Sequence, residues 1–173
     1  TSFVIDNKEN TIYTSSFDHL IVAWDMKVCA RFKQRNNYFR NNDANNFIIP
    51  EAVFVKVFSK LLLQTGEAKG VFKGHEDGVT SIKLADEFLI SCSADKTIRI
   101  WAKRVTIANK QIKPSHIIIQ TGQCMKILHG HSSFIFGMHI DGGKIYSYSQ
   151  DGTVRIWNIK VNFILVNVIF LEI

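Results

Sequence analysis

Two long segments of the chain repeat each other without a gap, and this regularity constrains the fold more than any other feature. The first segment is Gly74–Lys103, GHEDGVTSIKLADEFLISCSADKTIRIWAK, and the second is Gly130–Ile159, GHSSFIFGMHIDGGKIYSYSQDGTVRIWNI. In both of them a histidine precedes a tryptophan by 26 positions. A fixed spacing of this kind indicates that each copy is one structural unit that stacks on the next copy.

A third, partial copy lies near the start of the chain. The segment Thr11–Met26, TIYTSSFDHLIVAWDM, fits the second half of the same template. Counted back from its tryptophan, each of the three copies has an aspartate at six positions, a serine at eight and a serine or threonine at ten. The chain therefore contains two nearly complete copies and part of a third.

Each copy has the pattern of short strands joined by tight turns. EFLISCS and KIYSYS are rich in apolar, aromatic and hydroxyl residues, and TIRIW and TVRIW alternate β-branched with polar or basic residues. The polar breaks ADK and QDG between these runs predict antiparallel hairpins. VTSIKL and IFGMHI predict a strand before each hairpin, and EAKGVFK and QCMKILH predict a fourth strand.

A Gly-His dipeptide, a turn aspartate and a tryptophan at fixed spacing resemble the WD-repeat family of β-propellers. The matching dipeptides are Gly74-His75, Gly130-His131 and Trp24-Asp25, whereas Trp101-Ala102 and Trp157-Asn158 keep only the tryptophan. The resemblance implies an all-β fold: an incomplete β-propeller of WD-repeat blades, which are four-stranded antiparallel sheets, with irregular inserts. Because propellers close with typically four to eight blades, we expect a fragment of a larger WD-repeat protein, and assembly with other chains is the alternative.

In this family the histidine, a strand hydroxyl, the turn aspartate and the tryptophan of a blade form a hydrogen-bonded chain. The resemblance assigns this structural role to His75, Ser91, Asp95 and Trp101, to His131, Ser147, Asp151 and Trp157, and to the partial set Thr14, Asp18 and Trp24. Ser93 or Ser149 could supply the hydroxyl instead, but the threonine of the first copy favours Ser91 and Ser147. A catalytic triad is the alternative role, and recurrence once per blade favours the structural one.

The sequence indicates no other chemistry. His129 and His131 have no cysteine or carboxylate at ligand spacing beside them, so we predict no metal site. DGGK, at Asp141–Lys144, lacks the spacing of a phosphate-binding loop. We therefore expect a protein that is not an enzyme, with no cofactor and no small-molecule substrate. The apolar C-terminal run VNFILVNVIFLEI is too short to span a bilayer, so no membrane partner is expected.

Extra sequence interrupts the repeat at the same template position, between a tryptophan and the Thr-Gly that opens the next copy. Removing Val28–Gln64 and Val105–Gln120 brings both Trp-to-Trp distances to 40 residues, the lower edge of the family period of about 40–45. These pieces and the tail Val161–Ile173 begin with valine four positions after a tryptophan, and the first two end in glutamine. Introns begin with GT and end with AG. Valine codons begin with GT and a glutamine codon can be CAG, so the edges of these pieces fit the two ends of an intron. We favour translated introns, and genuine loops are the alternative.

These boundaries predict the organisation of the chain. The expected parts are a partial blade at 1–27, an insert at 28–64, a blade at 65–104, an insert at 105–120, a blade at 121–160 and an apolar tail at 161–173 that is not native propeller sequence. The inserts and tail together carry +5 of the net charge of +6, so a basic nucleic-acid face on the blades is not expected.

The leading functional interpretation is a non-enzymatic scaffold for contacts between proteins, because a propeller presents rigid loops on both rims. The resemblance implies that proteins or peptides bind beside the first strand and just before the turn aspartate. These candidates are Phe17, Gly78, Thr80, Ala94, Phe134, Phe136 and Gln150. At least one of the two phenylalanines in SSFIF could pack between blades instead. The parent could be a ubiquitin-ligase or signalling subunit that assembles multi-protein complexes.

Two further expectations concern RNA and location. The segment RFKQRNNYFRNN, at residues 31–42, interleaves arginine with aromatic residues, so an RNA-associated module is the alternative function. The three cysteines form no CxxC pair and are odd in number. This favours a reduced, intracellular setting and does not distinguish cytoplasm from nucleus.

Overall fold

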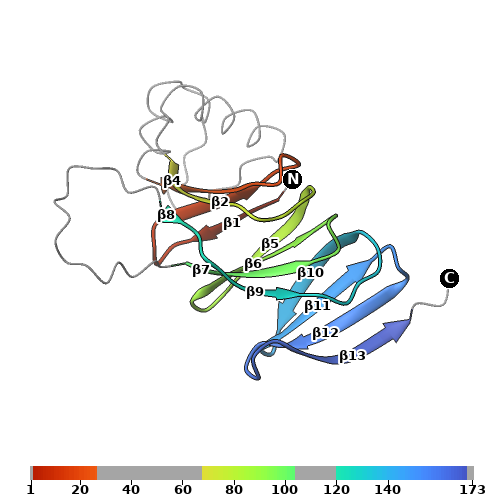
Figure 1. Ribbon diagram of the computed structural model, residues 1–173. Helices are drawn as coiled ribbons and strands as arrows, with labels where there is room; N and C mark the ends of the chain where they lie inside the picture. The colour runs from red at the N-terminus through yellow and green to blue at the C-terminus, as the bar shows by residue number, and fades with distance from the viewer. Residues whose placement is uncertain (1, 27–67, 104–119, 171–173) are drawn as a thin grey trace, which may run out of the picture.

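The computed structural model describes residues 2–26, 68–103 and 120–170, which form β-strands and the turns between them (Figure 1). The first sheet consists of β1 (Ser2–Asp6), β2 (Thr11–Ser15), β3 (Ile21–Asp25), β4 (Ala68–Phe72) and β8 (Gln120–Thr121). The second sheet consists of β5 (Val79–Ala85), β6 (Phe88–Ser93), β7 (Ile98–Ala102) and β9 (Cys124–Leu128). The third sheet consists of β10 (Ile135–Asp141), β11 (Lys144–Ser149), β12 (Thr153–Asn158) and β13 (Ile164–Phe170).

Three four-stranded antiparallel sheets make up the fold, so the all-β propeller-blade prediction is confirmed. The short strand β8 adds a parallel pairing to the outer edge of β4. Turn chemistry explains the hairpins. The two residues between β10 and β11, Gly142 and Gly143, both have positive φ, as a type I′ hairpin turn requires.

The sheets are offset by one strand from the sequence repeats. The strand β4 precedes β5 in the chain but pairs with β3 of the first sheet, and β9 pairs with β7 of the second sheet. The first and second sheets are thus each closed on the outer side by the strand that opens the next repeat. The strands β4 and β9 are hydrogen-bonded to one sheet and continue along the chain into the next sheet, so they link neighbouring sheets.

The second sheet is buried on both of its faces. Trp101 and Leu89 pack against the first sheet, and Phe72 of β4 meets the Trp101 indole edge-on with ring centroids 5.8 Å apart. On the other face, Ile98 and Ile100 pack against the third sheet. Burial on both sides explains why β6 and β7 are mostly apolar at successive positions instead of strictly alternating.

The third sheet has the same two faces, but only one of them is covered by described residues. Four positions of the second sheet, Ile90, Cys92, Ile98 and Ile100, are each 0% exposed. The template places Tyr146, Tyr148, Val154 and Ile156 at the corresponding positions of the third sheet, 56 residues further along the chain. Tyr148 is 46% exposed. We call this side of the third sheet the uncovered face.

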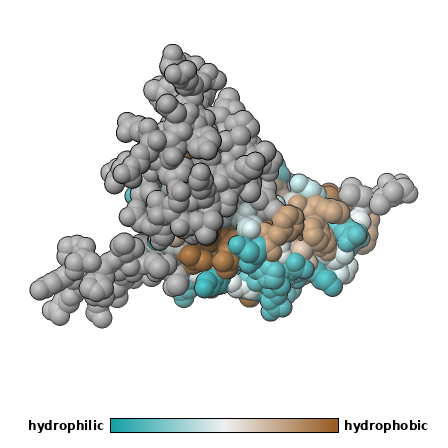
Figure 2. Space-filling view, turned by 90° about the horizontal axis from the view of Figure 1, so that it is seen from above, coloured by the Kyte–Doolittle hydropathy of each residue, from teal (hydrophilic) through white to brown (hydrophobic). Residues whose placement is uncertain are grey.

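The C-terminal tail takes part in the third sheet. Residues 164–170, expected to lie outside propeller sequence, form β13 and pair with β12 from Thr153 to Asn158. Figure 2 shows hydrophobic residues in more than one group on the face that it views, with hydrophilic residues between and around them. The inserts expected at 28–64 and 105–120 lie outside the described residues except for Gln120, so the domain boundaries and the intron origin stay predictions. In the described ranges there is no helix long and apolar enough to cross a membrane.

Two isoleucines at equivalent positions test the two faces. Ile100→Ala should cost about 2–5 kcal/mol of unfolding free energy, because it opens a cavity between packed sheets. Ile156→Ala, on the uncovered face, should cost clearly less, because its side chain is only half-buried. Denaturant unfolding followed by tryptophan fluorescence measures both values. Equal losses would mean that the uncovered face is packed in solution.

Candidate functional site

A chain of hydrogen bonds runs through the second sheet from a core strand to the loop before β5. The Trp101 indole Nε1 donates to Ser91 Oγ over 2.8 Å, and Ser91 Oγ lies 2.7 Å from His75 Nε2. On the other side of the ring, His75 Nδ1 lies 2.7 Å from Asp95 Oδ2. The histidine, serine and tryptophan are all buried, so each polar atom of the chain needs its partner.

The partners fix the direction of every bond. An ionised Asp95 carboxylate only accepts, so His75 Nδ1 must carry the proton that it donates. His75 Nε2 then accepts from the Ser91 hydroxyl, whose oxygen accepts from Trp101. The arrangement therefore sets the orientation of the His75 ring, with a partner for each of its two nitrogens.

The third sheet repeats the same geometry. His131 Nδ1 lies 2.8 Å from Asp151 Oδ2, and His131 Nε2 lies 2.8 Å from Ser147 Oγ. The Trp157 indole donates to Ser147 Oγ over 3.0 Å. The two full sets that the resemblance implied are thus each brought together by the fold.

The partial set of the first sheet is only partly joined. The Trp24 indole donates to Thr14 Oγ1 over 2.9 Å, as the serines accept in the other sheets. Asp18 is exposed, and its Oδ1 accepts from the Leu20 amide over 3.1 Å, within its own turn. The structure therefore does not connect Asp18 with Trp24 through a histidine.

The alternative hydroxyls have a different place. Ser93 Oγ donates to the Asp77 carbonyl over 2.9 Å, and Ser149 Oγ donates to the Phe134 carbonyl over 2.9 Å. Both serines are buried and tie the turn to the loop before the first strand. The structure thus has Ser91 and Ser147, not Ser93 and Ser149, in contact with the histidines.

The turn aspartates also bind the neighbouring loop directly. Asp95 Oδ2 accepts from the Glu76 amide over 3.0 Å, and Asp151 Oδ2 accepts from the Ser132 amide over 3.0 Å. Each aspartate therefore joins two loops of the same rim, the turn before the third strand and the loop before the first strand. The buried sets hold this rim in one conformation.

Two threonines complete the sets, and the sequence interpretation missed them. Thr97 Oγ1 donates to Asp95 Oδ1 over 2.7 Å, and Thr153 Oγ1 donates to Asp151 Oδ1 over 2.6 Å. A signal was present, because both repeats place a threonine two positions after the aspartate, in DKT and DGT. A short polar side chain at that distance commonly closes a turn around a carboxylate.

Electrostatics stabilise the ionised carboxylates and the neutral imidazole. Burial alone raises the pKa of Asp95, but hydrogen bonds from His75 and Thr97 outweigh it and hold the pKa well below its usual range. The pKa of Asp151 is lowered in the same way, against burial, by Thr153 and His131. Burial lowers the pKa of His131 below 6.5, although Asp151 opposes this shift. At neutral pH each set therefore keeps a charged aspartate.

A catalytic role for these sets is disfavoured by their burial. The Ser-His-Asp order is the order of a hydrolase triad, but Ser91 and Ser147 are both 0% exposed. Each serine oxygen already accepts a bond from a tryptophan. A substrate therefore has no path to either hydroxyl, and the geometry serves the fold.

The aromatic rim candidates occupy complementary positions at the two junctions between sheets. At the first junction Phe17 is 69% exposed, and its ring lies so close to Gly78 that an added Cβ would sit 2.6 Å from Phe17 Cδ1. The template puts Ala94 and Phe134 at the corresponding places of the second junction. At the first junction the earlier sheet supplies the large side chain, Phe17, and the later sheet supplies Gly78. At the second junction the earlier sheet supplies the small side chain, Ala94, and the later sheet supplies Phe134.

Other rim candidates make backbone or inter-sheet contacts. Thr80 Oγ1 donates to the Ile135 carbonyl over 2.8 Å and thereby joins the second sheet to the third. Phe136, at the same template position in the third sheet, is 53% exposed, and its ring centroid is 5.3 Å from that of Phe134. The Gln150 amide donates to the Phe134 carbonyl, as the Ala94 amide donates to Gly78. Partner binding by these residues stays a proposal.

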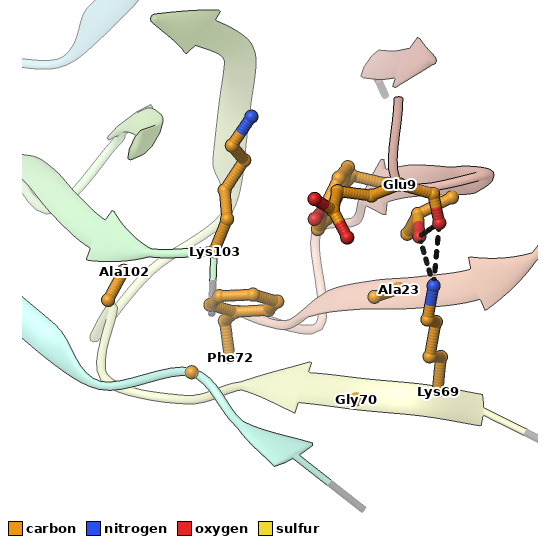
Figure 3. Close-up of a pocket in the computed structure, with 10 residues that line it drawn as sticks. Glu9, Ala23, Lys69, Gly70, Phe72, Ala102 and Lys103 are labelled. Atoms are coloured by element: carbon orange, nitrogen blue, oxygen red, sulfur yellow. Dashed lines mark hydrogen bonds between the residues drawn. The ribbon is translucent and has the colours of Figure 1, made fainter. Parts of the chain in front are cut away.

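A small pocket of about 90 Å³ lies between the first and second sheets (Figure 3). Figure 3 shows Lys69 of β4 reaching over its own sheet toward the start of β2, where its Nζ donates to the Glu9 carbonyl over 2.8 Å and to Thr11 Oγ1 over 2.7 Å. Sequence reasoning did not find this pocket, because its walls come from segments far apart in the chain.

The charges around this pocket are already balanced. Lys103 Nζ lies 2.9 Å from Asp6 Oδ2, and both side chains are buried, so the pair ties the second sheet to the first. Burial alone raises the pKa of Asp6, but the hydrogen bond and charge of Lys103, together with the backbone amides of Glu9 and Lys8, outweigh it and lower the pKa. Burial raises the pKa of Tyr13, which also lines the pocket, to about 12. In the described part of the chain no cluster of three or more His, Cys, Asp or Glu is placed to hold a metal.

Comparison with known proteins gives a consistent result. The family model "WD domain, G-beta repeat" matches residues 66–102 and 122–158. The WD repeat-containing protein pop2 of Schizosaccharomyces pombe is 32% identical over 104 residues, which are 57% of this chain and 14% of that protein. The F-box/WD repeat-containing protein sel-10 of Caenorhabditis elegans is 26% identical over 107 residues, 61% of this chain and 16% of that protein.

A third relative covers more of the chain. Cell division control protein 4 of Candida albicans is 32% identical over 151 residues, which are 86% of this chain and 17% of that protein. The chain therefore spans 14–17% of the length of these relatives. Among solved structures, the computationally designed Ika8 protein matches with a TM-score of 0.60 and 19% identity over 99% of this chain and 36% of its own. The designed Ika4 protein matches with a TM-score of 0.57 and 20% identity, over 96% and 69%.

Removing one central hydroxyl tests the hydrogen-bonded sets. Ser147→Ala should lower the unfolding free energy by about 1–3 kcal/mol, because it leaves the buried Trp157 indole N–H and His131 Nε2 without their partner. Ser132→Ala is the matched control, since that side chain is exposed. Chemical denaturation monitors both variants. Equal stability of the two variants would show that the buried set contributes nothing.

The stability should also depend on pH in a defined direction. His131 has a lowered pKa, so its contribution is complete above about pH 6.5 and is lost as the pH falls through the folded value. The aspartates also have lowered pKa values, so their contribution is present above about pH 4 and is lost on further acidification. Melting temperatures should therefore fall from pH 7 to pH 3. Asp151→Asn should reduce the fall in melting temperature at acid pH, and the exposed control Asp18→Asn should leave that fall as it is in the parent. The same dependence of melting temperature on pH in both variants would refute this.

Geometry and comparison lead to one conclusion. The described sheets have the strand order of propeller blades, and two of them contain a complete Trp-Ser-His-Asp set. The segments that carry these sets overlap the residues that the family model matches. The likeness to designed proteins, at low identity, supports the fold alone. This chain carries two WD40 repeats, at residues 66–102 and 122–158, and belongs with the WD-repeat proteins.

Proposed function

We propose that the chain is part of a non-enzymatic scaffold that binds proteins or peptides through the rim formed by its turn and loop residues. The observation that carries the proposal is Phe17, which is 69% exposed and rests on Gly78. The Val79 amide donates to the Ser16 carbonyl directly beneath it, so the ring projects from a fixed backbone. Rigid, exposed aromatic side chains are the usual anchors of a protein interface.

The chemistry of the rim favours an apolar partner. None of the seven candidates carries a charge, and their exposed members are Phe17, Phe136 and Gln150. A peptide with an apolar or aromatic side chain could cover Phe17, while its backbone meets polar groups at the turns. Binding should therefore depend only weakly on salt, unlike binding to nucleic acid.

The names of the relatives support a scaffold in a multi-protein complex. One relative is named as an F-box/WD repeat-containing protein, and another is named as a cell division control protein. Among the classes expected from the sequence, these names favour a ubiquitin-ligase subunit over other signalling complexes. An intracellular location is part of the same proposal. The RNA-associated alternative relies on residues 31–42, which lie outside the described residues and gain no support from the fold.

A peptide library displayed on phage tests the proposal with a defined probe. We expect selection on the folded chain to enrich peptides with apolar or aromatic anchors. Phe17→Ala should weaken these peptides about tenfold or more, because it removes the exposed anchor. Met125→Ala, at a side chain 55% exposed on β9, is the control and should bind as the parent does. Tryptophan fluorescence checks that both variants are folded.

Two outcomes of this selection count against the rim. Peptides that bind Phe17→Ala and Phe134→Ala as tightly as the parent would remove both aromatic anchors from the proposal. Enrichment of acidic peptides only, or binding that weakens steeply with salt, would favour the basic segment at residues 31–42 and thus the RNA-associated alternative.

A further inference from the structure

The outer strand of the third sheet is apolar at every position but one and is open at one edge. The strand β13, with the sequence ILVNVIF, pairs with β12 on one side and with no described residue on the other. It contains no charged residue and only one polar residue, Asn167. Its exposed apolar side chains are Ile164 at 54%, Leu165 at 37%, Val166 at 55%, Ile169 at 45% and Phe170 at 77%.

The other outer strands are protected in ways that β13 is not. The strand β9 contains Lys126, whose ammonium donates to the Asn162 carbonyl, and β4 contains Lys69. Lysine on an edge strand disfavours pairing with another chain, because pairing would desolvate its charge. The open edge of β13 has no lysine, proline or glycine to oppose pairing. One of its backbone donors, the Val168 amide, is already bonded to Asn167 Oδ1 over 2.8 Å, and pairing along the whole strand requires the Asn167 side chain to turn away.

The first sheet shows that an outer edge of this molecule can accept a further strand. The short strand β8 pairs in parallel with β4, Gly70 opposite Gln120 and Val71 opposite Thr121. The position that β8 takes beside β4 corresponds to the open edge of β13 in the third sheet. A strand added beside β13 would therefore repeat an arrangement that the fold already contains.

We propose that β13 pairs antiparallel with β13 of a second copy of this chain, which joins two third sheets across a two-fold axis. Two identical strands in antiparallel pairing are self-complementary, since every contact occurs twice. Both faces of β13 are apolar, and the same strand from another copy matches both of them at once. A charged partner would find no opposite charge on this strand.

The net charge of the chain predicts how this association responds to salt. Each copy carries +6, so two copies repel each other, and added salt screens that repulsion. Self-association through an uncharged strand should therefore strengthen as salt is raised. Association with an anionic partner, by contrast, would weaken under the same conditions.

Sedimentation velocity of the full chain over a wide concentration range provides the test. We expect a reversible monomer–dimer equilibrium that Val166→Lys weakens about tenfold or more, because a charge would be buried between paired edges. Met125→Lys is the matched control: its side chain is also 55% exposed and lies on the outer strand β9. Ile169→Lys is a second variant of β13, and tryptophan fluorescence checks the folding of all three.

A cross-link tests the geometry. Asn167 is the middle residue of β13, so pairing of the two full strands brings it opposite its own copy, within the reach of a disulfide. Asn167→Cys should give a covalent dimer on mild oxidation, and the parent chain with its native cysteines should not. A monomer at all concentrations, or equal dimerisation of Val166→Lys and the parent, would overturn the proposal. Loss of the dimer in Tyr148→Lys but not in Val166→Lys would place the contact on the uncovered face and overturn it too.

Discussion

The hydrogen-bonded chain from tryptophan through serine and histidine to aspartate is the interaction on which this structure depends. In the second sheet it connects Trp101 in β7, Ser91 in β6, the loop residue His75 and the turn residue Asp95. These four residues lie in four different segments; the bonds that join Trp101, Ser91 and His75 are buried, and the bond from His75 to Asp95 is partly buried. A buried polar group without its partner costs roughly 1–3 kcal/mol. The set therefore specifies one relative position for the strands and the rim loops.

Stacking of like sheets explains the rest of the architecture. The second and third sheets each pack their tryptophan face against the sheet before them, and the second sheet packs its aliphatic face against the third, so it is buried on both sides. The third sheet has the same aliphatic face, with Tyr146 and Ile156 in place of Ile90 and Ile100, but the described residues do not cover it. The stacking also determines which side chains lie on the rim. Sheets held at a fixed distance place one aromatic ring, Phe17 or Phe134, at each junction.

Much of this fold could be predicted from the sequence, and the reasons are local. Strands such as β6 and β12 follow from runs of apolar and β-branched residues between turn residues, and the repeat identifies Ser91 and Ser147. The sequence could not show the Lys103–Asp6 ion pair or the pocket near Lys69, because these join residues about 60 to 100 positions apart that no motif connects. It also could not show that residues 164–170 would form a strand, because that segment matches no part of the repeat.

The central claim is that the buried sets hold the rim in place, and amide hydrogen exchange tests it most directly. The Ser132 amide donates to Asp151, at the rim end of the set whose other end is Trp157. In Trp157→Phe, which removes the far indole donor together with part of the ring, we expect faster exchange at Ser132 and unchanged exchange at the Glu76 amide of the second sheet. Equal exchange at Ser132 in the variant and the parent would contradict the claim.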